Sequence, residues 1–466
     1  MNIKFTCAIA AAAALSGCAS VGPDYAQPSY SAPQKWHVSL DENEPGSVDK
    51  NWWMTFGDKN LLELMELAQK NNPTLDKALA AIEMAKAGAI RAGARGLPDI
   101  SARHSNIESK SLQLGKQITS TSKTNALDAS WEIDLFGSVR RASESGAARV
   151  ESAKAGYEDA LISLKAQVAS EYVTYKSCIV AKNIYERTLE SSKKTLQSTR
   201  DAMEQGALAK TDEQLAIASM QSMKSALVAQ GAECEAGIKN MTLLTSADEQ
   251  IVVKILNATP VGLPSPAKVS VQSLPAQLLT QRPDIVSAER NVASASAEIG
   301  FAQAAQYPRL TLNGSISSLT YSSGSSSIEA KPWSFGPSLT MPLFDAGATR
   351  AQIEQAKAAF TSAQATYKMT VLGAIRDVEQ ALVRLKASKS RIASAQESAK
   401  AYQYHLEASN SLWQVGQITT LTLEQSRRNA LQAEQTELSA RRDQLLYAIA
   451  LYKAIGGGWS VDEGQK

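Results

Sequence analysis

The stretch LWQVGQITTL (Leu412–Leu421) decides the fold, because it repeats a turn that the chain has already made at MEQGALAKTD (Met203–Asp212). Gly416 in the later stretch lies 210 positions after Gly206 in the earlier one. Two proline-containing pairs keep the same offset: Asn72-Pro73-Thr74 with Arg282-Pro283-Asp284, and Leu97-Pro98-Asp99-Ile100 with Tyr307-Pro308-Arg309-Leu310. A solenoid has a period of only about 20–50 residues. The chain therefore contains two copies of one large unit, at residues 71–245 and 281–455.

Each copy contains a long helical stretch without proline, at about 139–204 and 346–414. In the first stretch, apolar residues recur at the three-and-four spacing of a coiled-coil seam: Leu161, Leu164, Val168, Tyr172, Tyr175 and Ile179. At ~1.5 Å per residue, a helix of about 65 residues is a rod roughly 95 Å long. A glycine then turns the chain, and an antiparallel helix returns to about residue 245 or 455. We therefore expect two long helical hairpins with tips near Gly206 and Gly416.

Strand-like regions precede each long helix, at about 98–108 and 121–136 in the first copy and within about 308–344 in the second. In the segment WEIDL (131–135), apolar and acidic residues alternate, so the two kinds of side chain point to opposite faces. In the second copy, apolar residues lie on one face and serine, threonine and glycine on the other. The apolar residues are Trp333, Phe335, Leu339, Met341 and Leu343. Such a pattern is typical of a membrane barrel strand, although a soluble β-ribbon with one buried face has it too.

The connections between these strands are predicted from polar stretches. A Ser/Thr/Gly/Lys stretch separates the strands of the first copy, and the segment Tyr321–Ser327 is expected to be an exposed flexible loop. Leu135-Phe136 and Leu343-Phe344 are offset by 208 positions rather than 210. We therefore expect a two-residue deletion between the strands of the second copy.

Four strands cannot close a membrane barrel, and open sheet edges are not tolerated in lipid. Barrels made from one chain begin at about eight strands. Three chains would pool about 12 strands, and the same trimer would pool about 12 helical rods into a hollow tube. The predicted fold is thus mainly α with membrane β structure. A duplicated unit forms, as a homotrimer, a 12-stranded outer-membrane β-barrel continuous with a 12-helix periplasmic α-barrel.

The N-terminus, MNIKFTCAIAAAAALSGCAS, has an early lysine and an apolar run too short to span a bilayer, which is the layout of a secretory signal. Leu15-Ser16-Gly17-Cys18 has the layout of a bacterial lipobox. We predict a signal peptide at 1–17 and lipidation of Cys18, for example with palmitate. Ala19 favours sorting to the outer membrane. The alternative is an ordinary signal peptide with an incidental cysteine.

Charge and composition exclude several function classes. The chain has 48 basic and 46 acidic side chains, so nothing favours a nucleic-acid partner. His37, His104 and His405 are far apart in sequence and lack the spacing of metal ligands. The chain has no nucleophile elbow and no phosphate loop. We therefore predict no enzymatic activity, no metal and no cofactor.

Cys178 and Cys234 are predicted to form a disulfide, because each lies 28 residues from Gly206. Antiparallel helices joined there would place both at the same height, in a compartment where disulfides persist. The equivalent positions of the second copy, Ser388 and Gln444, have no cysteine. The alternative is two free cysteines packed between helices.

The chain resembles the TolC-type outer-membrane factors, and specifically their efflux lipoprotein branch, often called NodT-type. The residues that carry the resemblance are Cys18-Ala19-Ser20-Val21-Gly22-Pro23-Asp24-Tyr25 with Pro28, Trp52-Trp53 with Phe56, Trp131–Gly137, and Leu451–Trp459. The resemblance implies a trimeric channel-tunnel that is constricted at its periplasmic tip. It also implies a passive exit that docks a periplasmic adaptor (membrane fusion) protein and an inner-membrane pump, usually of the resistance-nodulation-division class.

The same resemblance implies a gate at the hairpin tips. Asp212 matches a tip aspartate of the family, and Trp413 stands where a tyrosine is often found. Other tip positions depart from the family pattern: Ile418 for an arginine, and Thr422 and Gln425 for lumen-facing aspartates. Asp212 has a second interpretation, because Thr211 and Gln214 are spaced as a capping box at the start of a helix.

We expect six regions: a signal peptide (1–17), a lipidated tether (18–58), a first repeat (59–245), a connection (246–280), a second repeat (281–455) and a tail (456–466). The predicted function is a passive exit duct for drugs, toxic compounds or metals, anchored by lipid in the bacterial outer membrane and extending into the periplasm. Two alternatives remain open at this point. One is the exit duct of a type I protein secretion system, and the other is a periplasmic adaptor lipoprotein.

Overall fold

The computed structural model describes residues 20–28, 35–38, 52–113, 115–258, 260–264 and 282–459. Cys18, the predicted signal peptide and the last residues of the tail lie outside the described residues. The chain forms two compact units: unit 1 is Met1–Tyr30, Ala80–Lys154 and Val286–Met369, and unit 2 is Ser31–Leu79, Ala155–Ile285 and Thr370–Lys466. Each unit takes segments from both halves of the chain, so the units do not follow the boundary between the repeats.

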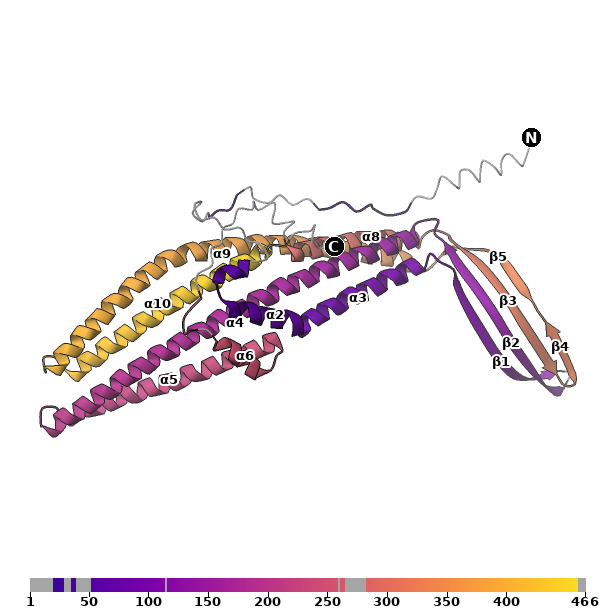
Figure 1. The fold of residues 1–466 in the computed structure, drawn as a ribbon. Helices are drawn as coiled ribbons and strands as arrows, with labels where there is room; N and C mark the ends of the chain where they lie inside the picture. The colour runs from indigo at the N-terminus through magenta and orange to yellow at the C-terminus, as the bar shows by residue number, and fades with distance from the viewer. Residues whose placement is uncertain are drawn as a thin grey trace. The chain divides into compact units, whose positions relative to one another are not determined.

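The helices repeat with the offset that the sequence predicts (Figure 1). The paired helices are α3 (Pro73–Ala94) with α8 (Pro283–Ala304), α4 (Ser138–Glu204) with α9 (Ala348–Gln414), and α5 (Lys210–Thr245) with α10 (Thr420–Ala454). The first copy is preceded by η1 (Trp52–Phe56) and α2 (Lys59–Asn71) and followed by α6 (Glu249–Leu256). Helices α3 and α8 both begin on a proline, whose missing N–H costs nothing at the first helical position. Among the described residues, no helix is long and apolar enough to cross a membrane.

Unit 1 contains one antiparallel sheet (Figure 1). Its strands are β1 (Asp99–Gln113), β2 (Lys116–Ile133), β3 (Arg309–Ser323), β4 (Ser326–Ala330) and β5 (Trp333–Thr340). β4 and β5 pair with different parts of β3, so they are two parts of one fourth strand. The break falls at Pro332, which has no N–H to donate; its carbonyl accepts the N–H of Ser317 instead.

The strands are longer than the sequence predicts. Residues 109–113 and 116–120, expected to lie in a loop, extend β1 and β2 and pair with each other. In the second copy, only a tight turn with Gly324 at φ 61° separates β3 from β4, so the expected loop at Tyr321–Ser327 is wrong. Serine and threonine lie on both faces of these extensions, so the apolar alternation that indicates a strand is missing there.

The predicted two-residue deletion is also wrong. Asp99 pairs with Ser130, and Arg309 pairs with Thr340, which keeps the 210-residue offset through both strands. The glycines that precede the long helices, Gly137 and Gly347, keep it as well and share a positive φ of 83° and 88°. The Leu-Phe pair of the second copy therefore lies two residues earlier in the same fold. Met341 and Leu343, expected in a strand, lie beyond the end of β5.

The register separates the two faces of the sheet. Trp131 is opposite Leu312, and Ile316 is opposite both Leu127 and Trp333, so the apolar side chains share one face. The same face continues at Phe335, which is 70% exposed in one chain. The other face is polar: Ser315 donates to Asp128 at 2.7 Å, and Ser130 donates to Asn313 at 3.2 Å.

In unit 2, two sequence motifs meet in the core. Trp52 stacks on Tyr452 with ring centroids 4.7 Å apart, and Trp53 and Phe56 are buried beside them. The hydroxyl of Tyr452 donates to the carbonyl of Gly457 at 2.7 Å. Aromatic residues bury large areas, and their ring contacts are worth about 0.5–1.5 kcal/mol beyond that burial. The motifs at 52–56 and 451–459 are thus one packing unit.

Candidate gate region at the hairpin tips

Both hairpins in unit 2 turn in the same way at their tips. Gly206 and Gly416 have φ of 72° and 74°, a left-handed conformation that glycine adopts without strain. The N–H of Ala207 bonds to the carbonyl of Ala202, and the N–H of Gln417 bonds to that of Leu412, both at 2.9 Å. These bonds close a Schellman motif at the end of each long helix. The two tips therefore lie where the sequence predicts them.

Asp212 caps the helix that leaves the first tip. Helix α5 begins at Lys210, and the N-cap residue is Ala209. The half-buried carboxylate of Asp212 accepts the N–H of Ala209 at 3.3 Å. The predicted capping box of Thr211 and Gln214 is therefore wrong, because Thr211 lies inside the first turn and is exposed. The start of α5 is hard to predict from the sequence, because alanine is a poor N-cap. The only local signal for this helix start is the aspartate three residues later.

A second acidic residue ties the first tip together and was missed in the sequence. Glu213 is 6% exposed and accepts from Arg200 of α4 at 3.1 Å, and Lys210 donates to its other oxygen. Hydrogen bonds from Lys210 and Arg200 lower the pKa of Glu213 from its ordinary value. The ion pair with Arg200 joins the two helices of the hairpin near the turn.

The second tip is held by neutral groups. Trp413 is half-buried, and its indole N–H donates to the hydroxyl of Thr420 at 3.3 Å. The hydroxyl of Thr419 caps α10 by accepting the N–H of Thr422 at 3.2 Å. The first turn of α10 has no acidic residue. Among the hydrogen bonds and ion pairs of the described residues, none joins Asp212 to Trp413.

A buried polar cluster connects the two hairpins of unit 2. Arg427 and Glu424 of α10 are 3% and 2% exposed and form an ion pair with each other. Arg427 also donates to the hydroxyl of Thr195 on α4 at 2.7 Å, and Ser219 of α5 donates to Glu424. We call Thr195, Ser219, Glu424 and Arg427 the interhairpin cluster. Its only signal in the sequence is a Glu-Arg pair three residues apart on a helix, which is common on exposed helices too.

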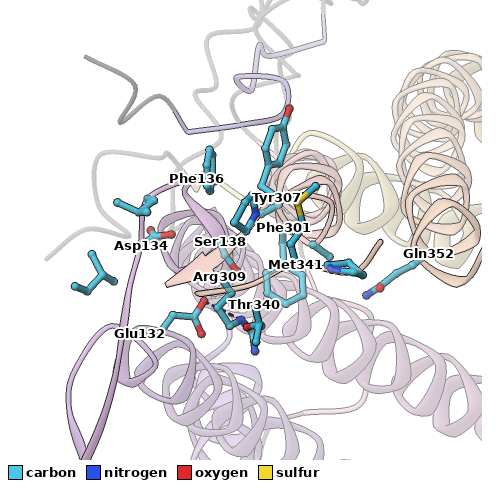
Figure 2. Close-up of a pocket in the computed structure, with 16 residues that line it drawn as sticks. Glu132, Asp134, Phe136, Ser138, Phe301, Tyr307, Arg309, Thr340, Met341 and Gln352 are labelled. Atoms are coloured by element: carbon cyan, nitrogen blue, oxygen red, sulfur yellow. Dashed lines mark ion pairs between the residues drawn. The ribbon is translucent and has the colours of Figure 1, made fainter. Parts of the chain in front are cut away.

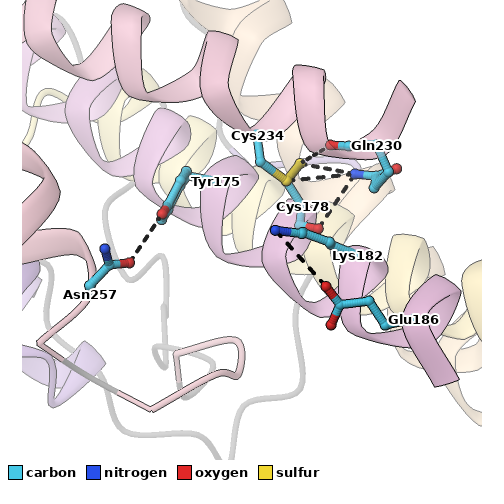
Figure 3. The surroundings of a disulfide bond; sticks show 7 residues. All are labelled: Tyr175, Cys178, Lys182, Glu186, Gln230, Cys234 and Asn257. Atoms are coloured by element: carbon cyan, nitrogen blue, oxygen red, sulfur yellow. Dashed lines mark hydrogen bonds and ion pairs between the residues drawn. A yellow bond between two sulfur atoms is a disulfide. The ribbon is translucent and has the colours of Figure 1, made fainter. Parts of the chain in front are cut away.

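The first hairpin contains a disulfide between Cys178 of α4 and Cys234 of α5 (Figure 3). Their Cα atoms lie 5.6 Å apart, as the equal spacing from Gly206 predicts. The side-chain amide of Gln230 donates to the carbonyl of Cys178 at 3.4 Å. At the equivalent position of the second hairpin, Ser388 is buried and donates to the carbonyl of Leu385. The covalent link is thus a property of one hairpin only.

Unit 1 has a hollow of about 520 Å³ where β2 and β3 meet the helices (Figure 2). Its charged groups are paired: Arg309 lies 3.4 Å from Glu132, and Arg140 lies 3.4 Å from Asp134. Phe136 stacks on Tyr307 with centroids 4.7 Å apart. Among the described residues, no group of three or more His, Cys, Asp or Glu side chains could hold a metal ion.

Comparisons with known proteins identify the family. The sequence model of the family described as "Outer membrane efflux protein" matches residues 64–233 and 274–457. The chain is 31% identical over 461 residues to "Nodulation protein T" of Rhizobium leguminosarum bv. trifolii, with 96% of each chain covered. It is 28% identical to "Pyoverdine export outer membrane protein OpmQ" of Pseudomonas aeruginosa, covering 99% of this chain and 98% of that protein.

Solved structures agree. The outer-membrane channel OprN is 28% identical, with a TM-score of 0.83, and the match covers 94% of this chain and 99% of that one. The CmeC outer membrane channel of Campylobacter jejuni shares the fold with a TM-score of 0.85. These matches exclude a periplasmic adaptor. The chain has two helical hairpins and a sheet, and solved channel structures match 94% and 96% of it. The chain therefore belongs to the outer membrane efflux protein family, and it is an outer-membrane efflux channel of the TolC-like fold.

Proposed function

We propose that this channel works as a homotrimer, anchored by lipid at Cys18, that forms the passive exit duct of a tripartite efflux system. An inner-membrane pump of the resistance-nodulation-division class delivers small molecules, and a periplasmic adaptor connects that pump to the hairpin tips. The duct itself performs no chemistry. It supplies a continuous polar path, and the pump supplies the energy.

The observation that carries this proposal is the sheet of unit 1, which has two different faces and two free edges. Within the described part of the chain, β1 pairs only with β2, and the β4–β5 strand pairs only with β3. Trp333 and Phe335 on the apolar face are 76% and 70% exposed in one chain. Lipid covers such a face at no cost, but it cannot satisfy the N–H and C=O groups of an open edge. Edge-to-edge pairing of three sheets removes every edge and reaches about 12 strands, within the range of membrane barrels.

The polar face of the sheet suits a conduit rather than a binding site. Arg103 lies 3.6 Å from Asp128, and Arg309 lies 3.4 Å from Glu132 on the same face. Paired charges weaken the attraction of the wall for a charged solute, so a passing molecule is not held there. The relatives' names mention pyoverdine, toluene and cations. This range supports small molecules as the class of cargo.

Two features of unit 2 support a gate at the tips. Asp212 and the Arg200–Glu213 pair fix the first tip, and the interhairpin cluster fixes α10 against α4 and α5. A tip can open only if the hairpins move, so the interhairpin cluster stabilises the closed arrangement, while the contacts of Asp212 and of the Arg200–Glu213 pair keep the first tip rigid. In this proposal Asp212 caps α5 and, through the rigid tip, contributes to closure.

A deletion strain tests the proposed cargo. The strain is expected to become more susceptible to drugs, toxic organic compounds or metal ions, and the gene on a plasmid restores resistance. A matched plasmid carrying a chain without residues 309–340 is not expected to restore resistance, because that chain lacks β3, β4 and β5. If the deletion changes no susceptibility and instead abolishes export of a protein, the chain is the exit of a protein secretion system.

A further inference from the structure

Residues 20–25 are folded into unit 1, although the sequence predicts a tether there. The N–H of Val21 donates to the carbonyl of Phe136 at 3.0 Å, just beyond the end of β2. This is the segment Ser20-Val21-Gly22-Pro23-Asp24-Tyr25, which follows the lipobox cysteine. It contacts the short loop that joins the sheet to α4, and a buried residue of α4 binds it further.

Arg141 of α4 makes most of the side-chain hydrogen bonds to this segment. Its side chain is 4% exposed. It donates to the carbonyls of Val21 at 3.1 Å and Gly22 at 3.3 Å, and to the carboxylate of Asp24 at 2.8 Å. On α4 itself, Arg141 also donates to Glu144 at 2.8 Å. A buried charge without hydrogen bonds is strongly unfavourable, and the segment supplies three acceptors to Arg141 against one from α4, so it stabilises the buried guanidinium.

The surface beneath the segment is shaped to its backbone. A Cβ added to Gly137 would lie 2.0 Å from the hydroxyl of Ser20, and one added to Gly300 of α8 would lie 2.7 Å from the carbonyl of Val21. A Cβ on Gly22 would lie 2.3 Å from the Cα of Gly300. Real Cβ atoms never approach so closely, so glycine is required on both sides of the contact.

A second contact holds the end of the segment. The hydroxyl of Tyr25 donates to the carboxylate of Glu289 on α8, a residue that is 4% exposed. Glu289 is also paired with Arg290 at 2.8 Å. The segment is therefore fixed to α4 by Arg141 and to α8 by Glu289, and both helices belong to unit 1 at these positions.

We propose that residues 20–25 are a docking strap, held by Arg141, that fixes the lipid on Cys18 to the junction between β2 and α4. This inference rests on the proposed lipid anchor. Only Ala19 separates Cys18 from Ser20, and two residues of chain reach at most about 7 Å. The acyl chains then enter the bilayer beside the end of the sheet, and the anchor holds the sheet unit itself rather than a free tether.

A photo-crosslinking experiment tests the strap in the full chain. Benzoylphenylalanine replaces Leu135, next to Phe136, in cells fed radioactive palmitate. After irradiation and proteolysis, palmitate is expected on the fragment that contains position 135. The control places the same crosslinker at Thr119, towards the other end of β2, where no cross-link to the labelled segment is expected. Arg141→Gln is expected to reduce the cross-link at position 135 at least tenfold.

Matched variants separate docking from folding. Arg149→Gln removes another arginine of α4, one that binds Glu298 and Ser294 but not the strap, so its cross-link stays at the wild-type level. Asp24→Asn leaves Arg141 in place and is expected to speed hydrogen exchange of the Val21 amide about tenfold. Unchanged exchange in Asp24→Asn together with an unchanged cross-link in Arg141→Gln overturns the role of Arg141.

The outcomes also distinguish the strap from the anchor. A wild-type chain that incorporates palmitate but gives no cross-link at position 135 contradicts the strap alone. A wild-type chain without palmitate contradicts the anchor and the strap together. Neither result affects the efflux function, which the deletion strain measures separately.

Discussion

Arg427 on α10 donates a 2.7 Å hydrogen bond to the hydroxyl of Thr195 on α4, and this bond joins the two hairpins in the protein interior. Arg427 is 3% exposed, so water does not replace the bond when it is lost. Helix α4 of the first hairpin and helix α10 of the second are thus connected by a buried charged group. Any movement that separates the hairpins here must leave the guanidinium without one of its acceptors.

Thr195→Val is therefore expected to weaken the closed arrangement. The substitution keeps the shape of the side chain and removes the acceptor, and an unsatisfied buried group costs about 1–3 kcal/mol, more when it is charged. Planar-bilayer recordings are expected to show more frequent or larger openings than the wild-type channel. Thr188→Val is the control, since Thr188 of α4 donates only to Ile184 of its own helix. Equal conductance of the two variants and the wild type contradicts the role of the cluster.

Asp212→Ala separates the gate from the cap. Loss of this acidic residue from the first turn alone destabilises α5 by about 0.3–1 kcal/mol, which lowers the melting temperature without changing conductance. If Asp212 also holds the tip closed, the Asp212→Ala channel conducts more than the wild type, and this is the expected result. Thr211→Ala is the control, because Thr211 is exposed in the same turn. If an intact Asp212→Ala trimer has unchanged conductance, Asp212 acts only as a helix cap.

Acid is expected to loosen the first tip through Glu213. Hydrogen bonds from Lys210 and Arg200 lower its pKa in the folded protein below the ordinary value of 4.5. A lowered folded pKa means that the ion pairs stabilise the tip fully above about pH 4.5 and lose their effect as pH falls through the folded value. Hydrogen exchange at the α4–α5 tip reports this. The difference between wild type and Glu213→Gln shrinks on acidification, and a difference independent of pH down to about 3 contradicts the assignment.

The disulfide is expected to persist in the exported protein. It closes a stretch of 56 residues, for which the chain-entropy account gives about 4 kcal/mol as an upper value. Thiol titration under denaturing, non-reducing conditions is expected to find neither Cys178 nor Cys234 reactive. Cys178→Ser is expected to lower the unfolding temperature and expose one thiol, at Cys234. Two reactive thiols in the wild-type protein would refute the bridge.

Arginine substitutions on neighbouring strand positions test which face meets lipid. Trp333→Arg places a charge on the apolar face and is expected to cost about 2–4 kcal/mol if the position lies near the bilayer midplane. Ser334→Arg changes the next residue, which lies opposite Ser315 on the polar face, and is expected to fold and insert normally. Insertion is measured in the membrane fraction, as the share of the protein that keeps its folded gel mobility until the sample is heated. Equal losses in both variants contradict the assignment of the faces.

Local signals in the sequence predict the helices and tips well. Proline and glycine punctuate the chain at fixed positions, so the bounds of α4 and α9 differ by at most two residues from those predicted. The Cys178–Cys234 bond also follows from spacing, because antiparallel helices with a known turn have only one register. The structural duplication is visible for the same reason.

Features that depend on tertiary contacts are invisible in the sequence. Nothing local distinguishes Arg427, which is buried against Thr195, from Arg441, which pairs with a glutamate of the same helix at the surface. The sequence does not predict the paired ends of β1 and β2, because serine and threonine lie there on both faces of the sheet. The docking of Val21 against Phe136 joins residues over a hundred positions apart, and no periodicity records such a contact.

The central claim is that three chains pool their sheets and hairpins into one duct. Light scattering of the protein extracted from membranes in mild detergent, with the detergent mass subtracted, tests it most directly. The account predicts three times the mass of the processed chain, which without processing is 49.8 kDa. A monomeric mass for protein that still conducts in bilayers would contradict it.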